Sequence, residues 1–234
     1  MTALLLVGFG KLARMILALN EEQKSFYIYN RTAWKVKKAA SRDPRIRYGG
    51  TDTFMDHKEA FLALPPKACI DFLKENRYLF PADCTFYLGA TALMAEEVEK
   101  EAPGLHVVPA KFAGHAQQAV RERNGGLFLM PKAYLAERNE LQRWLGPAFS
   151  VVEAEEKNAA AANKIAVEET ITMIDALSER LEQENIPERI QKTVLSQIPA
   201  GVIQAHLEET HGRFAEKIWQ SLQHKKGEQE NESR

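Results

Sequence analysis

The chain has 234 residues, enough for one large domain or for a medium domain and a small one, and its apolar fraction of 45% suits a packed interior. Lysine and arginine number 31 against 32 acidic residues, so no excess charge attracts nucleic acid or an anionic membrane surface. The first apolar run, Leu4 to Val7, is too short to cross a membrane and lacks the flanks of a signal peptide, so we expect a cytoplasmic protein.

Short apolar runs alternate with amphipathic stretches over the first half of the chain. The predicted strands are residues 4–7, 26–29, 46–48, 61–64, 85–88 and 106–108, and helices are predicted within 12–19, 33–40, 68–73 and 93–101. Strands without inner alternation, joined by helices, are typical of a parallel sheet covered on both faces. The pattern therefore predicts an α/β, doubly wound first domain.

Farther along, Gly125 and Gly126 break the chain before a further candidate strand. The predicted elements there are a strand at 127–130, a helix at 135–145 and a last strand at 149–152. These elements complete a first domain over residues 1–154.

No strand-like run follows residue 155, and we predict a small all-helical domain over 155–222. Its first helix is expected to end at Asn185, which tolerates a left-handed C-cap, and the next to begin after Pro187. So few helices have little interior of their own, so their apolar faces need either the first domain or a second copy of the chain, and we predict a homodimer through them. The polar residues 223–234 are expected to form a disordered tail.

The strongest motif, Gly8-Phe9-Gly10-Lys11-Leu12-Ala13, follows a predicted strand and opens a predicted helix. In the Rossmann-type fold, glycines at such a corner allow a tight turn and let a diphosphate approach the backbone N–H groups at the helix start. The motif predicts dinucleotide binding. The alternative is a tight glycine turn that binds nothing.

The second strand ends in Asn30-Arg31-Thr32, where NAD-binding proteins usually place an acidic residue on the adenosine ribose. Arg31 can instead stack on adenine or bind a 2'-phosphate, and Thr32 and Lys35 add donors. We therefore predict NADP rather than NAD. Lys37 and Lys38 are interpreted as a solvated helix face.

These segments resemble the pyrroline-5-carboxylate reductases, within a larger group of two-domain NADP-binding proteins like 6-phosphogluconate dehydrogenase. The family's G-x-G-x-M-A turn is matched by Gly8, Gly10, Leu12 and Ala13, and its N-R-S/T by Asn30-Arg31-Thr32. Its A-V-K-P turn, which touches the cofactor, is similar to Ala63-Leu64-Pro65-Pro66. The resemblance implies that these four residues also bind NADP.

The resemblance also has gaps, all on the substrate side. The family's V-M-P-N-T-P segment is similar to residues 107–112, but Ala110 replaces its asparagine. Its S-G-S-G-P-A-Y segment is replaced by residues 158–163, and its later S-P-G-G-T-T segment is absent. Proline synthesis is therefore not inferred.

The catalytic candidates are Lys111, His115 and Asn163. Lys111 and His115 follow a strand at the carboxyl edge of the sheet, where they could bind a carboxylate or donate a proton. The alternative for both is an exposed loop residue. Asn163 is early in the long helix, where related hydroxyacid dehydrogenases carry a lysine and an asparagine four residues apart, a spacing that Lys157 and Asn163 do not reproduce. No metal site is expected, since Cys69 and Cys84 are isolated and interpreted as reduced core thiols.

Three functions remain open from the sequence, of which one is a helical interaction module whose first domain is only a scaffold and binds no dinucleotide. The first is an NADP-dependent oxidoreductase that reduces a small imine or carbonyl acid, with the nicotinamide carrying the hydride. The second is a noncatalytic NADP-binding sensor or accessory dimer, suggested by the missing substrate segments.

Overall fold

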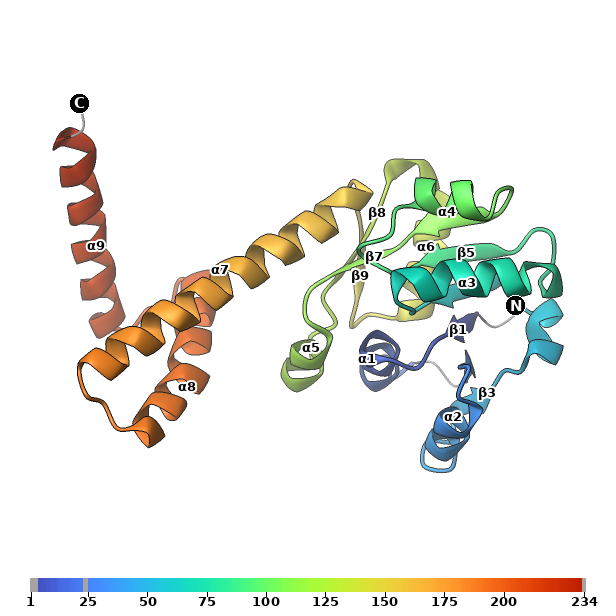
Figure 1. Ribbon diagram of the computed structural model, residues 1–234, viewed down its shortest axis with the longest axis horizontal. Helices are drawn as coiled ribbons and strands as arrows, with labels where there is room; N and C mark the ends of the chain where they lie inside the picture. The colour runs from blue at the N-terminus through green and yellow to red at the C-terminus, as the bar shows by residue number, and fades with distance from the viewer. Residues whose placement is uncertain (1–3, 23–24, 233–234) are drawn as a thin grey trace. The chain divides into compact units, whose positions relative to one another are not determined.

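The computed structural model describes residues 4–22 and 25–232, with side chains to residue 224. Its main sheet has parallel strands in the order β3-β2-β1-β4-β5-β6 (Figure 1). The strands are β1 Leu5–Val7, β2 Phe26–Tyr29, β3 Ile46–Tyr48, β4 Glu59–Leu62, β5 Thr85–Leu88 and β6 His106–Pro109. The order reverses between β1 and β4, and open α/β sheets bind ligands at the carboxyl ends of strands where the order reverses. The predicted doubly wound fold is confirmed.

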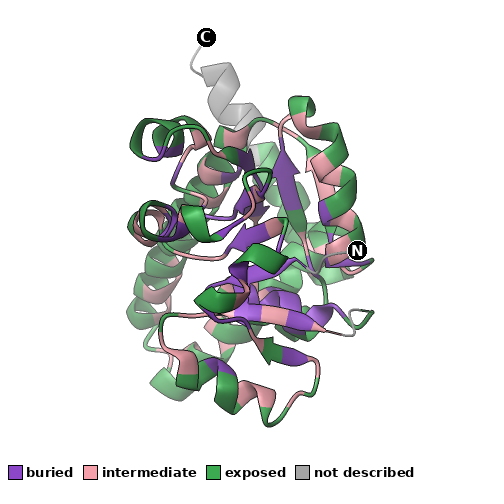
Figure 2. Cartoon of the chain, turned by 90° about the vertical axis from the view of Figure 1, so that its right-hand side faces the viewer, coloured by how far each residue is buried: buried purple, intermediate pink, exposed green. Residues whose placement is uncertain are grey.

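The strands of this sheet are largely buried, whereas the helices around them are largely exposed (Figure 2). Successive side chains of β1 pack on opposite faces of the sheet. Leu6 of β1 lies in the cluster with α1 (Lys11–Leu19) and α2 (Ala33–Ala40). Leu5 and Val7 lie in the cluster with α3 (Pro66–Asn76) and α4 (Ala95–Glu101). The connections also contain the short helices η1 (Thr51–Asp56) and η2 (Arg77–Leu79). Both faces are covered, as expected for parallel strands with apolar runs.

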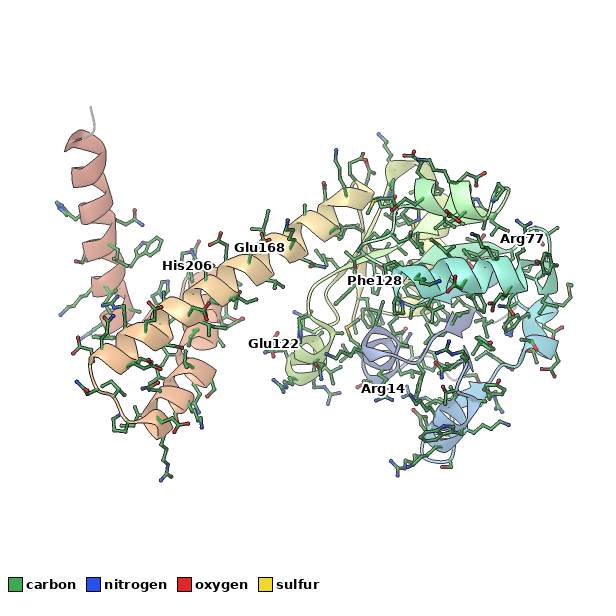
Figure 3. All side chains as sticks on the ribbon, viewed as in Figure 1. Arg14, Arg77, Glu122, Phe128, Glu168 and His206 are labelled. Carbon is green, nitrogen blue, oxygen red and sulfur yellow. The ribbon has the colours of Figure 1, made fainter. Side chains whose placement is uncertain are left out.

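A second sheet has the order β7-β8-β9. Its strands are β7 Lys111–Ala113, β8 Leu127–Met130 and β9 Ser150–Glu153, connected through α5 (Ala116–Glu122), η3 (Lys132–Tyr134) and α6 (Leu135–Leu145). β8 is antiparallel to β7 and parallel to β9. The ring of Phe128 in β8, labelled in Figure 3, packs edge-on against Phe61 of β4 at 5.8 Å. The sequence did not predict β7, α5 or the separation of this sheet.

The chain divides into compact units of residues 1–165 and 166–234, with the division inside α7 (Glu156–Gln183). The second unit continues with α8 (Glu188–Leu207) and α9 (Arg213–Glu232). Asn185 has a φ of 55°, which confirms the predicted left-handed end of the long helix. α8 contains no buried residue.

α9 extends through most of the segment 223–234 for which the composition predicts no fixed structure. Glutamate, glutamine and lysine are good helix formers, so a polar sequence can still continue a helix. Residues 233 and 234 lie outside the described residues. Within the described chain, no helix is both long and apolar enough to cross a lipid bilayer.

Candidate functional site

The turn between β1 and α1 packs against the turn that follows β4. Gly8 has a φ of 103°, in the left-handed region that glycine adopts without strain. A Cβ atom there would lie 2.5 Å from the carbonyl oxygen of Ala63 and 3.0 Å from Cδ2 of Leu64. The structure thus brings together three of the predicted cofactor-binding residues. The close approach requires glycine at position 8.

The second glycine of the turn faces open space. Gly10 is the N-cap of α1, with a φ of −87° and no side-chain cap. A Cβ atom at Gly10 would meet no heavy atom of the described residues within 4 Å. The first N–H groups of a helix, here including those of Lys11 and Leu12, have no acceptor within the helix. Unused donors beside open space fit a diphosphate.

The predicted adenosine-binding residues lie between β2 and α2. The side-chain amide of Asn30 donates to the carbonyl oxygen of Thr32 at 3.1 Å, and Thr32 is the N-cap of α2. Arg31 is exposed and has no hydrogen-bond or ion-pair partner among the described residues. Its guanidinium is therefore available to an anion or an aromatic ring.

An open cavity of about 500 Å³ lies between α1 and α2. Its lining residues are Phe9, Arg14, Trp34, Lys35, Lys38, Ala39, Arg42, Asp43 and Ile46. Phe9 comes from the glycine turn, and the guanidinium of Arg14, labelled in Figure 3, lies 4.9 Å from the centre of the Phe9 ring. The only acid of the lining, Asp43, is bonded to Arg45 at 2.8 Å, and these hydrogen bonds lower the pKa of Asp43. The charged residues of the cavity wall are therefore mostly cationic, beside an apolar surface from Phe9, Trp34, Ala39 and Ile46.

Most of these lining residues, including Lys38, Trp34 and Arg14, were not singled out from the sequence as ligand-binding. Lys38 was interpreted as solvated, yet it lines the cavity beside Lys35. Trp34 was given no ligand-binding role from the sequence, and 61% of it is exposed. Arg14 was not a candidate, because its place in the cavity wall depends on how α1 and α2 are arranged in the fold. The usable signal for Trp34 was its position in the first turn of α2, directly after Asn30-Arg31-Thr32.

The turn after β4 contributes apolar surface rather than donors. Pro65 is the N-cap of α3 and Pro66 is its first residue. Neither has an N–H group, so the start of α3 offers fewer donors than the start of α1. Contacts from this turn to a nucleotide would therefore be mainly van der Waals contacts.

The three catalytic candidates are all engaged within the first unit. Lys111 is fully buried in β7 rather than exposed in a loop, and its ammonium contacts three protein oxygens. Asn163 of α7 donates to Phe112 O at 3.0 Å and accepts from Gly114 N at 3.1 Å, which joins α7 to β7. His115 caps α5, with Nδ1 accepting from the backbone N–H of Gln118 at 3.3 Å.

His115 is the only one of these three whose residue is exposed. The two cysteines are buried, and burial raises the pKa of the Cys69 thiol to about 11 and that of Cys84 to about 12. Both thiols therefore stay protonated near neutral pH. No group of three or more histidine, cysteine, aspartate or glutamate residues in the described chain is arranged to bind a metal ion.

Solved structures share this fold at low sequence identity. A pyrroline-5-carboxylate reductase from Coxiella burnetii superposes with a TM-score of 0.71 and 14% identity, over 99% of this chain and 92% of that one. A Plasmodium falciparum pyrroline carboxylate reductase with NADP bound has a TM-score of 0.62 and 13% identity, over 87% and 78% of the two chains.

An imine reductase from Aspergillus terreus has a TM-score of 0.58 and 10% identity, over 87% of this chain and 73% of that one. No protein-family model matches the chain, and neither does any curated protein. The chain therefore has the fold of the pyrroline-5-carboxylate reductases and of related reductases.

Proposed function

We propose that this chain is a cytoplasmic NADP-dependent oxidoreductase that reduces a small imine or carbonyl acid by hydride transfer. The observation that carries this proposal is the open space at Gly10, which faces the unused N–H groups of α1. The fold is also that of reductases, including one solved with NADP bound.

The cationic surroundings favour NADP over NAD. Arg31 is exposed without an ion-pair partner, and Lys35 lines the adjacent cavity. Asn30-Arg31-Thr32 contains no carboxylate that would repel a 2'-phosphate. A guanidinium can bind two phosphate oxygens at once, so we assign the 2'-phosphate to Arg31 with Thr32 and Lys35.

The residues of the chain would bind and orient the cofactor and the substrate, and would not react themselves. A bound nicotinamide supplies the hydride, and the backbone at Gly8 to Leu12 holds the diphosphate. The turn at residues 63–66 packs against the glycine turn and is assigned to the cofactor as well. Of the three catalytic candidates, His115 is the one exposed enough to exchange a proton with a substrate.

One observation favours a noncatalytic function as the second candidate. The Lys111 ammonium and the Asn163 amide, which were candidates to contact the substrate, are already bonded to the protein. An NADP-binding sensor or accessory dimer needs neither of them.

The test is the oxidation of NADPH, followed at 340 nm across a panel of cyclic imines and 2-oxo acids. We expect at least one member of the panel to accelerate the oxidation above the rate without substrate. Saturable NADPH binding without acceleration by any member would favour the noncatalytic candidate. Absence of binding would overturn both.

We further propose that the chain is a homodimer through its C-terminal helices. Val167, Ile171 and Ile174 form an apolar stripe on α7, and they are 57%, 53% and 42% exposed. α8 and α9 carry further exposed apolar residues, which are Ile190, Ile198, Val202, Ile203, Leu207, Phe214, Ile218, Trp219 and Leu222. Exposed apolar surface of this extent is typical of an interface between copies of a chain.

We expect sedimentation equilibrium to give twice the chain mass of 26.4 kDa. The double variant Ile171→Asp, Ile174→Asp should sediment as a monomer, because burying two carboxylates in an apolar interface is unfavourable. Thr172→Asp adds the same type of charge at an exposed neighbouring position of α7 and should remain dimeric. A monomeric unmodified chain would contradict the homodimer.

A further inference from the structure

Lys111 donates to three oxygens in the interior of the first unit. Its Nζ lies 2.8 Å from the carbonyl oxygen of Ala90, 2.6 Å from that of Leu93 and 3.0 Å from Oε1 of Glu156. An ammonium has three protons, so each proton has an acceptor. Lys111 itself has no exposed surface. Its charge is therefore committed to the protein and not to a ligand.

Glu156 extends this contact to two helices. It belongs to the first turn of α7, and its two carboxylate oxygens accept from the backbone N–H of Ala95, at 3.0 Å and 3.2 Å. Ala95 is the first residue of α4. The pair of Lys111 and Glu156 thus joins β7, the connection 89–94 between β5 and α4, and the beginnings of α4 and α7.

Two effects of opposite sign act on the charge of Lys111. Burial lowers the pKa of Lys111, and the Glu156 carboxylate acts against this shift. The Glu97 carboxylate of α4 also favours the charged form, whereas the Cys69 thiol of α3, which also faces the ammonium, is uncharged near neutral pH. A buried charge is costly to retain, and removing one partner leaves the other uncompensated. Only apolar side chains at both positions 111 and 156 would avoid this cost.

The connection held by Lys111 follows β5 at the carboxyl edge of the main sheet. Gly89 there donates to Leu62 O at 3.2 Å, and Ala110 donates to Leu88 O at 3.1 Å. The same edge carries the glycine turn after β1 and the turn after β4. Open parallel sheets bind their ligands at this edge, so residues 89–94 lie where the dinucleotide continues beyond its diphosphate.

We propose that Lys111 is a positioning residue for this site: its ammonium fixes residues 89–94 as the support for the nicotinamide end of NADP. The inference rests on the proposed function, because it assigns a role toward the cofactor. It explains why a charged side chain occupies an interior position without reaching solvent. Lys111 then affects the hydride step through the position of the connection, not through a proton of its own.

The test compares Lys111→Met, Lys111→Arg and Glu156→Gln with the unmodified chain. Lys100→Met is the matched control, because Lys100 lies on α4 but is exposed and pairs only with Glu96 at 2.7 Å. Two quantities are measured on each protein: amide hydrogen exchange of residues 89–95 with and without NADPH, and the dissociation constant of NADPH. The turnover number of any accepted substrate is added.

In Lys111→Met we expect exchange at 89–95 to accelerate roughly tenfold, since two buried carbonyl oxygens lose their donor. NADPH should still bind through the glycine turn but no longer protect residues 89–95. Turnover should fall about a hundredfold from misplacement of the reacting atoms, with little change in KM. Lys111→Arg should recover part of the protection and the turnover, because a guanidinium donates to the same oxygens.

The unmodified enzyme should also lose turnover as the pH rises through the lowered pKa of Lys111, since the neutral amine has one proton fewer for its three acceptors. Lys111→Arg should lack this alkaline decrease, because arginine keeps its charge.

Unchanged exchange and NADPH protection at 89–95 in both Lys111→Met and Glu156→Gln would overturn the inference. If Lys111→Met does not fold, the same two measurements on Glu156→Gln alone decide the inference. Glu156→Gln keeps the size of the side chain. If the unmodified chain binds NADPH but residues 89–95 gain no protection from exchange, the inference about Lys111 is also overturned. The proposal that the cofactor is NADP would then still stand. An unmodified chain that does not bind NADPH would instead overturn the proposed function.

Discussion

Gly10→Val is expected to weaken NADPH binding by at least about a hundredfold while the protein remains folded. The φ of −87° at Gly10 suits any L-residue, and no heavy atom of the described residues lies within 4 Å of its Cβ position. The valine methyl groups would therefore occupy only the space assigned to the diphosphate. The dissociation constant is measured by fluorescence titration, and the melting temperature is measured on the same sample.

Two other glycines provide the comparison. Gly212→Val is the matched control, since a Cβ at Gly212 also meets no heavy atom within 4 Å, and NADPH affinity should not change. Gly8→Ala should lower the melting temperature as well as the affinity, because of the φ of 103° and the 2.5 Å approach to Ala63 O. Wild-type NADPH affinity in a folded Gly10→Val protein would remove the diphosphate from this turn.

Arg31→Asp is expected to change the preference between the two nicotinamide cofactors. We expect NADPH affinity to decrease by roughly one to two orders of magnitude, because a charge-assisted bond to the 2'-phosphate is replaced by repulsion. NADH lacks this phosphate, so its affinity should change by much less. Titrations with both cofactors at low and high salt measure the difference, which should shrink as salt screens the charges.

Lys37→Glu is the control for this substitution. It makes the same change of two charge units on α2, but Lys37 does not line the cavity and its ammonium lies 5.2 Å from the Tyr48 ring. Only a small, long-range effect on NADPH affinity is expected. If Lys37→Glu and Arg31→Asp weaken NADPH equally, the effect comes from net charge rather than from a phosphate contact.

Local patterns were sufficient for the elements that form the cofactor side of the fold. The bounds Phe26–Tyr29, Ala33–Ala40 and Ile46–Tyr48 agree with the prediction, because apolar periodicity within each segment determines them. β4 lies at Glu59–Leu62, two residues before the predicted strand, so Ala63 and Leu64 are in the turn. The glycine motif was recognised because its strand, turn and helix are contiguous in sequence.

Features that depend on distant pairing could not be predicted. β7 has three residues and exists because it pairs with β8, from which it is separated by α5. Lys111 is 45 residues from Glu156, so no local pattern distinguishes a buried ion pair from a solvated lysine. The cavity beside Phe9 likewise requires α1 and α2 to lie side by side. The sequence could name the backbone proposed to bind the diphosphate but not the side chains that tertiary packing brings near it.

The most direct test of the central claim is a calorimetric titration of the unmodified protein with NADPH and, separately, with NADH. The account expects one saturable site per chain for NADPH, with an affinity at least about tenfold higher than for NADH, equivalent to ~1.4 kcal/mol. No saturable binding of either cofactor, or tighter binding of NADH, would contradict it.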